Sequence, residues 1–357
     1  MKRREPLTNT QLLTTIAICI FASMYAIAII TDVQGFRKFQ MLFDLLNDNA
    51  YLIIISCALS IVMIGGGINI SVGGVISLTV MACSLYLNGT GLQNSLGIIV
   101  TLLLALGIGL AFGIGQGFLV SYLEIQPFIV TLAGMFLSRG LTTILSVEPV
   151  KVSAQTHAAF YAFRSNKIEI PFLGYIAQNG NMIPAKLEIG AVVALLVVIF
   201  CFLLLRYVKL GRNIYAIGGN QQSALMLGIN VKRTRFLSYV ISGLLSGLAG
   251  FVFLMHKPTG NASVAMRSEM DAIAASIIGG TLLTGGVGNV IGSFFGAMIL
   301  ATIQKIIGMS KLNDSWWQDM ASGALLGLFI MLQSVILSTR EKRRAKRNTA
   351  KPVLQKG

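Results

Sequence analysis

The sequence predicts an all-α polytopic membrane protein with about ten transmembrane helices, within a range of eight to ten. Hydrophobic residues make up 55% of the 357 residues and charged residues only 11%, with a mean hydropathy of +0.76. Several apolar stretches approach the length of about 20 residues that a helix needs to cross a bilayer core of about 30 Å. Basic residues gather between alternate stretches. This composition excludes a disordered chain, a coiled coil and an ordinary soluble enzyme.

Ten apolar stretches are candidate spans. Three of them are short or adjoin glycine clusters, so we expect some helices to be broken inside the membrane. The first stretch follows basic residues as a signal peptide would, but no cleavage site is evident after it, so we expect a retained helix. The ten stretches lie near residues 12–30, 50–64, 70–87, 96–120, 126–146, 187–206, 235–256, 270–284, 290–309 and 316–338.

The net charge of +15 is mainly a signal of topology. If the N-terminus is cytoplasmic, 17 of the 28 Lys and Arg residues fall in cytoplasmic segments, and Arg139 falls inside a span. This bias favours a multi-pass membrane protein with both termini cytoplasmic. We expect a cytoplasmic N-terminus at 1–11, one transmembrane domain at 12–338 and a basic cytoplasmic tail at 339–357. The tail suits an anionic lipid surface, so the bilayer is the expected partner and nucleic acid is not.

Two connections are much longer than the rest. Residues 147–186 are expected on the extracytoplasmic side and residues 207–234 on the cytoplasmic side. Long ordered connections usually carry function, whereas short ones only join helices. Each of the two is therefore a candidate docking surface.

Two glycine clusters stand between apolar stretches, at 65–74 and 279–289. Both indicate helix breaks at membrane depth, where freed backbone groups must face protein or a water-filled path. Paired breaks in two halves of a chain point to a translocation pathway. Close helix packing through small residues is the alternative, and we expect it for the glycines of the span at 96–120.

Arg139 is the one basic residue predicted inside a span. At a helix centre it would cost roughly 2.5 to 3.5 kcal/mol, so it should face protein or the outer interface. A functional role, a structural ion pair and an anchor at the outer interface all remain open. The four cysteines and two histidines are scattered, so neither a metal site nor a cofactor is expected in this chain.

The chain also lacks the motifs of several enzyme classes. It contains no phosphate-binding Gly-x-x-x-x-Gly-Lys-Ser/Thr loop, no His-Glu-x-x-His and no Gly-x-Ser-x-Gly. It has no cluster of intramembrane carboxylates that could relay protons. The energy for transport must then come from a partner, unless the protein is a passive channel.

Four groups of motifs, in order along the chain, together resemble the membrane subunits of ribose/galactose-type ABC sugar importers. The ending Ser315-Trp316-Trp317 with Leu332-Gln333 is similar to the second permease of galactofuranose importers. One departure is Asn69, where this family usually has aspartate. The motifs are GGGINISVG at 65–73, QPFIVTLAG at 126–134 with Arg139-Gly140, YAIGGN at 215–220 with GINV at 228–231, and DAIAA at 271–275 with IGGT at 278–281 and GGVGNVIG at 285–292.

The resemblance implies a type II ABC importer of the bacterial cytoplasmic (inner) membrane. Such permeases form a dimeric pore with a second copy or a paralogue, above cytosolic ABC ATPases that use ATP, and an extracytoplasmic sugar-binding protein delivers the sugar. Residues 207–234 would contain the coupling loop that docks on the ATPase. In that loop we expect a sharp turn, a helix cap and a small apolar face, formed respectively by Gly218 and Gly219, by Asn220, and by Ala224, Leu225, Leu227 and Gly228.

The expected function is inward transport of a monosaccharide, a pentose or hexose such as ribose or galactofuranose, by alternating access. A stand-alone channel or a secondary transporter for a small polar solute remains the alternative. A membrane-embedded enzyme would need a catalytic constellation that the sequence lacks. Neutral hydrogen-bonding side chains in the two breaks are the candidates for the pathway: Asn69, Ser71, Thr281, Thr284 and Asn289.

Overall fold

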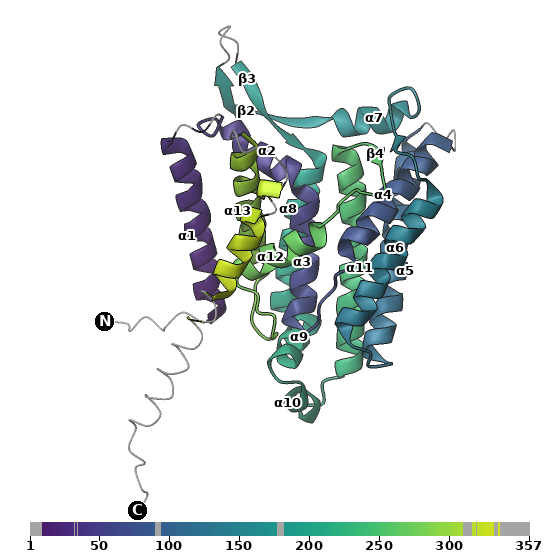
Figure 1. Cartoon of the computed structure of the whole chain (residues 1–357), viewed down its shortest axis with the longest axis vertical. Helices are drawn as coiled ribbons and strands as arrows, with labels where there is room; N and C mark the ends of the chain where they lie inside the picture. The colour runs from purple at the N-terminus through teal and green to yellow at the C-terminus, as the bar shows by residue number, and fades with distance from the viewer. Residues whose placement is uncertain are drawn as a thin grey trace, which may run out of the picture.

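The computed structural model describes residues 9–31, 33, 35–89, 94–176, 182–309, 316–318, 320–331 and 335. Its long helices stand side by side and alternate in direction (Figure 1). In this part of the chain seven helices are long and apolar enough to cross a membrane, or eight if α2 and α3, bent by 60° at their junction, form one span. The prediction of a helical polytopic membrane protein is confirmed, and the count of about ten spans stays a prediction.

The long helices match most of the predicted spans. Their bounds are α1 (Asn9–Ile30), α3 (Ala50–Ile64), α4 (Val72–Gly89), α5 (Ser95–Ser121), α6 (Pro127–Leu145), α8 (Ile189–Tyr207), α11 (Val231–His256) and α13 (Val290–Met309), with the shorter α2 (Phe39–Asp48) before α3.

The predicted span 270–284 is wrong in its second half. Only the 11 residues of α12 (Ser268–Ile278) are helical. Gly280, Gly285 and Gly286 have positive φ angles, which a right-handed helix cannot contain. Of the predicted span 316–338, residues 316–318 and 320–331 are helical. Residues 1–8 and the tail at 339–357 lie outside the described residues.

The long extracytoplasmic loop of the prediction contains strands. β1 (Val150–Lys151) pairs antiparallel with β4 (Thr259–Gly260), and β2 (Lys167–Ile176) pairs antiparallel with β3 (Met182–Glu188). The short helix α7 (Ala158–Ser165) precedes the β2–β3 hairpin. These elements and α2 lie together at one end of the molecule, called the hairpin end below (Figure 1).

The other predicted loop, 207–234, is mostly helical. It forms α9 (Lys209–Gly219), α10 (Gln221–Met226) and the first turn of α11. Figure 1 shows α9 and α10 at the end opposite the hairpin, called the α9–α10 end below. A compact helical corner can transmit a displacement, which a flexible loop cannot do.

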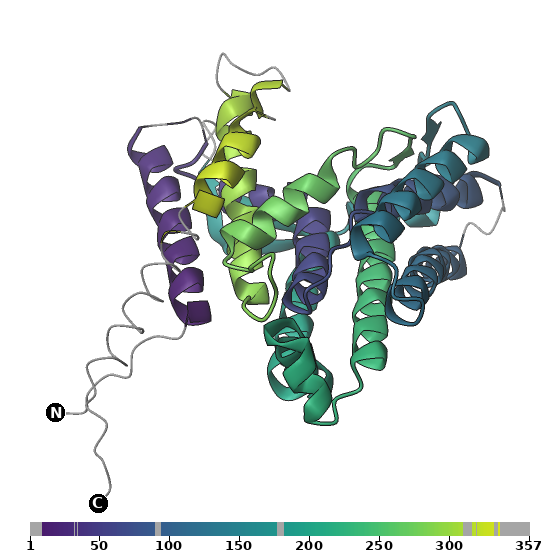
Figure 2. The ribbon, with the colours of Figure 1, turned by 60° about the horizontal axis from the view of Figure 1, so that its bottom comes forward.

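α3 forms the centre of the core. It is apolar all round, as a helix must be when it is surrounded by other helices, and every residue from Leu52 to Ile64 is buried. It packs against α8, α11, α12 and α13. Figure 2 shows α3 between α11 and α12, with α1 and α5 on opposite flanks. α3 therefore connects the hairpin end with the α9–α10 end.

Glycines let α5 and α11 approach each other closely. A Cβ atom on Gly243 would lie 2.6 Å from the Cα of Gly113, and one on Gly109 would lie 2.9 Å from the Cα of Gly247. Close packing through small residues is thus confirmed here. It is wrong for Gly107 and Gly115 of the same helix, where a Cβ would meet nothing within 4 Å, because they lie on another face.

Candidate functional site

The first helix break follows α3 and turns sharply at Gly66, whose φ is +79°. The backbone N–H groups of Gly66 and Gly67 donate to the carbonyls of Met63 and Val62, which closes the end of α3. Tyr239 of α11 then donates its hydroxyl to the carbonyl of Ile68 at 3.0 Å. The freed backbone of the break is therefore held by protein, as membrane depth requires.

Asn69 and Ser71 meet two polar side chains that sequence reasoning did not identify. The Asn69 amide donates to the Ser242 hydroxyl at 3.0 Å and accepts from the Ser71 backbone N–H and hydroxyl at 3.1 and 2.7 Å. Gln116 of α5 donates to the Ser71 hydroxyl at 2.8 Å. All four side chains are buried. We call Asn69, Ser71, Gln116 and Ser242 the polar cluster; its hydrogen bonds are satisfied internally, so this is a closed arrangement.

Asn69 suits this cluster because an amide both donates and accepts. An aspartate, the usual family residue, would place a charge among groups that are all neutral. The amide keeps the hydrogen bonds without the cost of burying a charge. The departure noted in the sequence thus has a local physical reason.

The second break runs from Gly279 to Asn289. Its backbone turns back on itself, with the Leu282 N–H donating to the Val287 carbonyl at 3.0 Å. Thr281 is fully buried, and its hydroxyl has no hydrogen-bond partner among the described residues. Thr284, by contrast, is exposed. Of these two pathway candidates, only Thr281 offers a buried polar group that a solute could satisfy.

The two breaks and α9 meet at one point. The Gly286 N–H donates to the Ile64 carbonyl at 2.8 Å, so the second break holds the end of α3. A Cβ on Gly285 would lie 2.9 Å from the Cα of Gly66 and 3.0 Å from the carbonyl oxygen of Gly218. We call Gly66, Gly218, Gly285 and Gly286 the glycine junction. Only glycine permits this approach of three backbones.

The glycine junction explains Gly218 better than the predicted sharp turn does. Gly218 and Gly219 are the last residues of α9 and neither has a positive φ. The chain turns instead at Asn220, whose side chain caps α10 by accepting from the Ser223 N–H at 2.8 Å. The predicted helix cap is confirmed, whereas the predicted glycine turn is wrong. Gly218 provides room for a neighbouring backbone.

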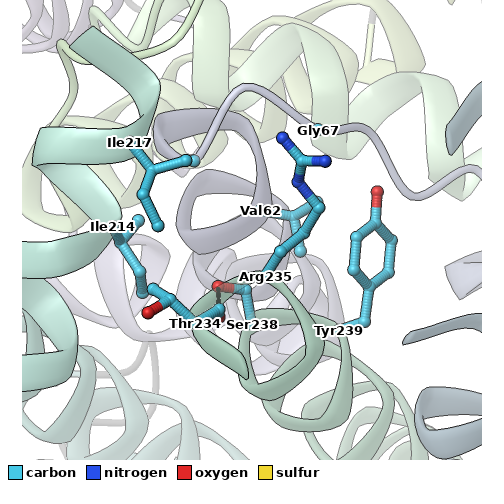
Figure 3. A pocket seen from close by; sticks show the side chains of 9 residues that line it. Val62, Gly67, Ile214, Ile217, Thr234, Arg235, Ser238 and Tyr239 are labelled. Carbon is cyan, nitrogen blue, oxygen red and sulfur yellow. Dashed lines mark hydrogen bonds between the residues drawn. The ribbon is translucent and has the colours of Figure 1, made fainter. Parts of the chain in front are cut away.

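A cavity of about 10 Å³, the size of one water molecule, lies beside the junction. In Figure 3, Arg235 and Tyr239 of α11 extend alongside each other on the side of the first break, and Ile214 and Ile217 of α9 form the opposite wall. Arg235 donates to Gln221 at 2.8 Å and so connects α11 with α10. The first break, α9, α10 and α11 thus share one small contact region.

The apolar side chains exposed on the predicted coupling loop are only partly those that the sequence predicted. Ala224 is 1% exposed and packs with Ile217 and Val231 inside the helical corner. Its small side chain supports the corner and does not face a partner. The exposed apolar side chains are Leu225, Met226 and Leu227, and Met226 is 88% exposed. Gly228 follows them with a φ of +76°.

Arg139 is paired. Its guanidinium lies 3.4 Å from the Glu269 carboxylate and 3.4 Å from the Ala265 carbonyl oxygen. Ala265 lies just before α12, and Glu269 lies in the first turn of that helix. Gly73 leaves room for the carboxylate, which a Cβ there would overlap. Of the interpretations left open, the structure contains the ion pair with Glu269.

Asn289 lies away from the polar cluster. It ends the second break, where its side chain accepts from the Ile291 N–H at 3.1 Å, and it lines a pocket with Arg206 and Arg212. The hydroxyl of Tyr215 donates to the adjacent Gly288 carbonyl at 2.8 Å. Asn289 is therefore separate from the site formed by Asn69 and Ser71.

Comparison with known proteins identifies the family. A family model described as "Branched-chain amino acid transport system / permease component" matches residues 41–331. The chain belongs to this permease family. The permease is 35% identical to the inner membrane ABC transporter permease protein YjfF of Escherichia coli, over 91% of this chain and 92% of the relative. No solved structure gives a significant match to the permease.

Two further relatives carry sugar names. The permease is 33% identical to the fructose import permease protein FruG of Bifidobacterium longum, over 83% of each chain. It is 32% identical to the xylose transport system permease protein XylH of Escherichia coli, over 91% of this chain and 92% of the relative. The resemblance to sugar importers of the ABC type is confirmed. The particular likeness to galactofuranose permeases stays a prediction.

Proposed function

We propose that this permease subunit moves a monosaccharide, a pentose or hexose, inward by alternating access, with energy from ATP hydrolysis on a partner ABC ATPase. The relatives named for fructose and xylose support the substrate class. The glycine junction is the structural basis of the proposed mechanism, because it joins both helix breaks directly to α9. A displacement of α9 must therefore move both breaks together.

The α9–α10 end is the proposed docking site of the ATPase. Leu225, Met226 and Leu227 are exposed there. Asn220 caps α10 and Arg235 connects it to α11, so the helical corner is firmly held. A rigid projection with apolar side chains at its tip suits a groove on a partner and would transmit the partner's closure to α9.

The polar cluster is the proposed sugar pathway. Behind it, a groove of about 460 Å³ opens between α5 and α6, and Gln116 is the one polar side chain among the described residues that line it. Gln116 also donates to Ser71, so the groove leads directly to the polar cluster. We propose that the second permease, a copy or a paralogue, covers this groove and that the sugar passes between the two subunits. Neutral groups suit weak, transient contact with hydroxyls, and Thr281 could join them.

The hairpin end is the proposed contact of the extracytoplasmic sugar-binding protein. This orientation places both termini and the α9–α10 end in the cytoplasm of the cell and the permease in the inner membrane. The basic residues support it, because six of them lie between Arg206 and Arg235 without any acidic residue. The binding protein, rather than the permease, would select the sugar.

The test is a substitution at the tip of α10. Met226→Glu should abolish co-purification of the ATPase and ATP-driven sugar uptake in reconstituted vesicles, because it places a charge in an apolar contact. Met266→Glu is the matched control, since Met266 is also exposed, at 66%, but lies in the segment before α12. It should leave co-purification unchanged.

Two outcomes would contradict the proposal. If Met226→Glu leaves ATPase assembly and uptake at the level of the unaltered protein, α10 is not the coupling element. If the permease transports a solute without ATP or an ATPase, it is a stand-alone channel or secondary transporter. If instead the proposal holds, a panel of ribose, xylose, fructose, galactose and galactofuranose with the purified binding protein would identify the sugar.

A further inference from the structure

A pocket of about 460 Å³ opens at the α9–α10 end, on the side of the molecule where α1, α8 and α9 meet. It is separate from the polar cluster and from the exposed tip of α10. Three helices and the second break contribute its lining. Its polar and aromatic lining consists of Gln11 of α1, Phe202 and Arg206 of α8, Arg212 and Tyr215 of α9, and Asn289 at the end of the second break.

The pocket is positively charged. Arg206 and Arg212 line it, and neither forms an ion pair with an acidic residue of the described chain. The sequence from Ile189 to Arg235 contains no Asp or Glu at all. The two guanidinium groups therefore present uncompensated charge to whatever enters the pocket.

Both guanidinium groups are held in place. That of Arg206 lies 5.6 Å from the ring centroids of Phe202 and Tyr207. That of Arg212 donates to the Tyr207 carbonyl at 3.0 Å. Stacking and a single backbone contact orient a guanidinium but leave most of its five N–H donors for a ligand. This arrangement suits an anion with several oxygen acceptors, such as a phosphate.

An apolar stripe runs along the outer face of α8 beside Arg206, which follows Leu203 of the stripe by three residues. Its members recur at helical spacing and are all exposed, so they face the bilayer in a membrane protein. Tyr207, at the end of the stripe, is beside Arg206 and marks the level of the interface. The stripe consists of Leu196, Ile199, Phe200, Leu203 and Tyr207.

From these features we propose that the arginine pocket binds the headgroup of an anionic phospholipid. The phosphate lies between Arg206 and Arg212, and the acyl chains follow the exposed stripe of α8. A free phosphate would use the guanidinium groups but not the stripe. A zwitterionic lipid such as phosphatidylcholine would bring a cationic choline group to two arginines, so the pocket selects for net negative charge.

The position of the pocket gives the lipid an effect on the fold. Asn289 lines the pocket, and Tyr215, which also lines it, donates to the Gly288 carbonyl. A lipid bound there contacts α1, α8, α9 and the end of the second break at once. Because a ligand stabilises the arrangement to which it binds, the anionic lipid should stabilise the docking of α9 on the second break.

The experiment measures lipid binding to the purified full-length permease. The protein in detergent is mixed with phosphatidylglycerol or phosphatidylcholine, and bound lipid is measured by native mass spectrometry alongside the melting temperature. Arg206→Gln with Arg212→Gln should weaken phosphatidylglycerol binding at least about tenfold and remove its stabilising effect, because charge-assisted contacts to phosphate are lost. Lys232→Gln with Arg233→Gln is the matched control, because it removes two charges at the same end outside the pocket.

Retention of phosphatidylglycerol by the Arg206/Arg212 double variant would overturn the proposal. An equal loss of phosphatidylglycerol binding in the control would also overturn it, because that result would indicate a general effect of surface charge. Inorganic phosphate should stabilise the protein much less than phosphatidylglycerol does; equal stabilisation would identify a phosphate site rather than a lipid site. The measurement requires neither ATP nor sugar, so its failure would leave the proposed transport function untouched, and failure of that function would leave the lipid site untouched.

Discussion

Gly218 and Gly219 are neighbours in α9, yet only at Gly218 would an added Cβ meet the backbone of other segments. A Cβ on Gly218 would overlap the Ile64 carbonyl oxygen and lie 2.5 Å from the Gly286 nitrogen, whereas one on Gly219 would meet nothing within 4 Å. The obstacles at Gly218 are backbone atoms, which cannot rotate away as a side chain can. Substitutions at these two positions therefore distinguish the free-energy cost of crowding from the free-energy change of replacing a glycine by itself.

We expect Gly218→Ala to lower the free energy of unfolding by about 1 to 3 kcal/mol, because it forces α9 away from α3 and the second break. Gly219→Ala should change it by no more than about 0.5 to 1 kcal/mol, in the stabilising direction, since alanine favours a helix. The melting temperatures of the purified variants measure both changes in stability. Equal effects of the two substitutions would argue against the glycine junction.

Arg139 and Glu269 permit a second test at the scale of single residues. Replacing Glu269 by Met leaves the largely buried guanidinium without its carboxylate and should cost about 2 to 3 kcal/mol of stability. Arg139→Met should cost a similar amount. The double variant should cost clearly less than the two together, because it leaves no unpaired charge. Strict additivity in the melting data would mean that the two charges do not interact.

Among the elements, α2 shows how the hairpin is fixed to the membrane domain. Gln40 accepts from the Lys186 N–H at 2.7 Å, and Asn47 accepts from the Glu188 N–H at 2.9 Å. Two side-chain amides of a helix thus bond to the backbone of β3 as a neighbouring strand would. Glu188 then lies 2.8 Å from His256 at the end of α11. The hairpin, α2 and α11 are therefore held together through one strand end.

This attachment predicts a dependence on pH. The hydrogen bond with His256, and after it that with Lys167, lowers the pKa of Glu188 from 4.5 to about 2, although partial burial acts in the opposite direction. A lowered pKa in the folded state contributes stability above the unfolded value, and that contribution is lost as the pH falls from about 4.5 to about 2. The unaltered protein should lose stability across this range.

Glu188→Gln removes the titrating group, so its melting temperature should be lower at neutral pH and should fall less than that of the unaltered protein across the same range. Glu169→Gln is the control, because Glu169 is an exposed partner of Lys186 in the same hairpin. Its pH profile should follow that of the unaltered protein. A Glu188→Gln profile parallel to the other two would show that this carboxylate does not attach the hairpin.

For the whole molecule, the two ends differ in construction. The hairpin end has strands and ion pairs, and the α9–α10 end has a helical corner with exposed apolar side chains. α3 runs between them, from α2 to the glycine junction (Figure 1). A partner at one end can therefore influence the other through one rigid, fully buried helix.

The proposed orientation gives a direct prediction at this scale. In right-side-out spheroplasts, a membrane-impermeant maleimide should label Glu169→Cys and should leave Met226→Cys unlabelled until the membrane is opened. The background should be low because Cys57, Cys83 and Cys201 are buried, and Cys19 can be replaced by Ser. The reverse labelling pattern would invert the topology.

Much of the fold could be predicted because hydropathy and chain length alone decide where a helix can cross lipid. The spans of α1, α5, α6, α8, α11 and α13 follow from this rule. The β2–β3 hairpin could not be predicted, because its strands lie outside the membrane and pair with one another, which hydropathy does not indicate. The end of α12 at Ile278 agrees with the predicted break at 279–289, and only the course of the chain through that break required the structure.

The sequence by itself determined a membrane permease, two glycine breaks with candidate residues such as Asn69, and a capped helix after Asn220. Only the tertiary structure decided that the two breaks meet α9 at Gly218, that Gln116 and Ser242 complete the polar cluster, and that Ala224 is buried while Met226 is exposed. The physical reason is one of range. Hydropathy, capping and glycine spacing act within a few residues of the chain, whereas contact between backbones more than 150 residues apart in sequence, as between Ile64 and Gly286, exists only after the helices pack.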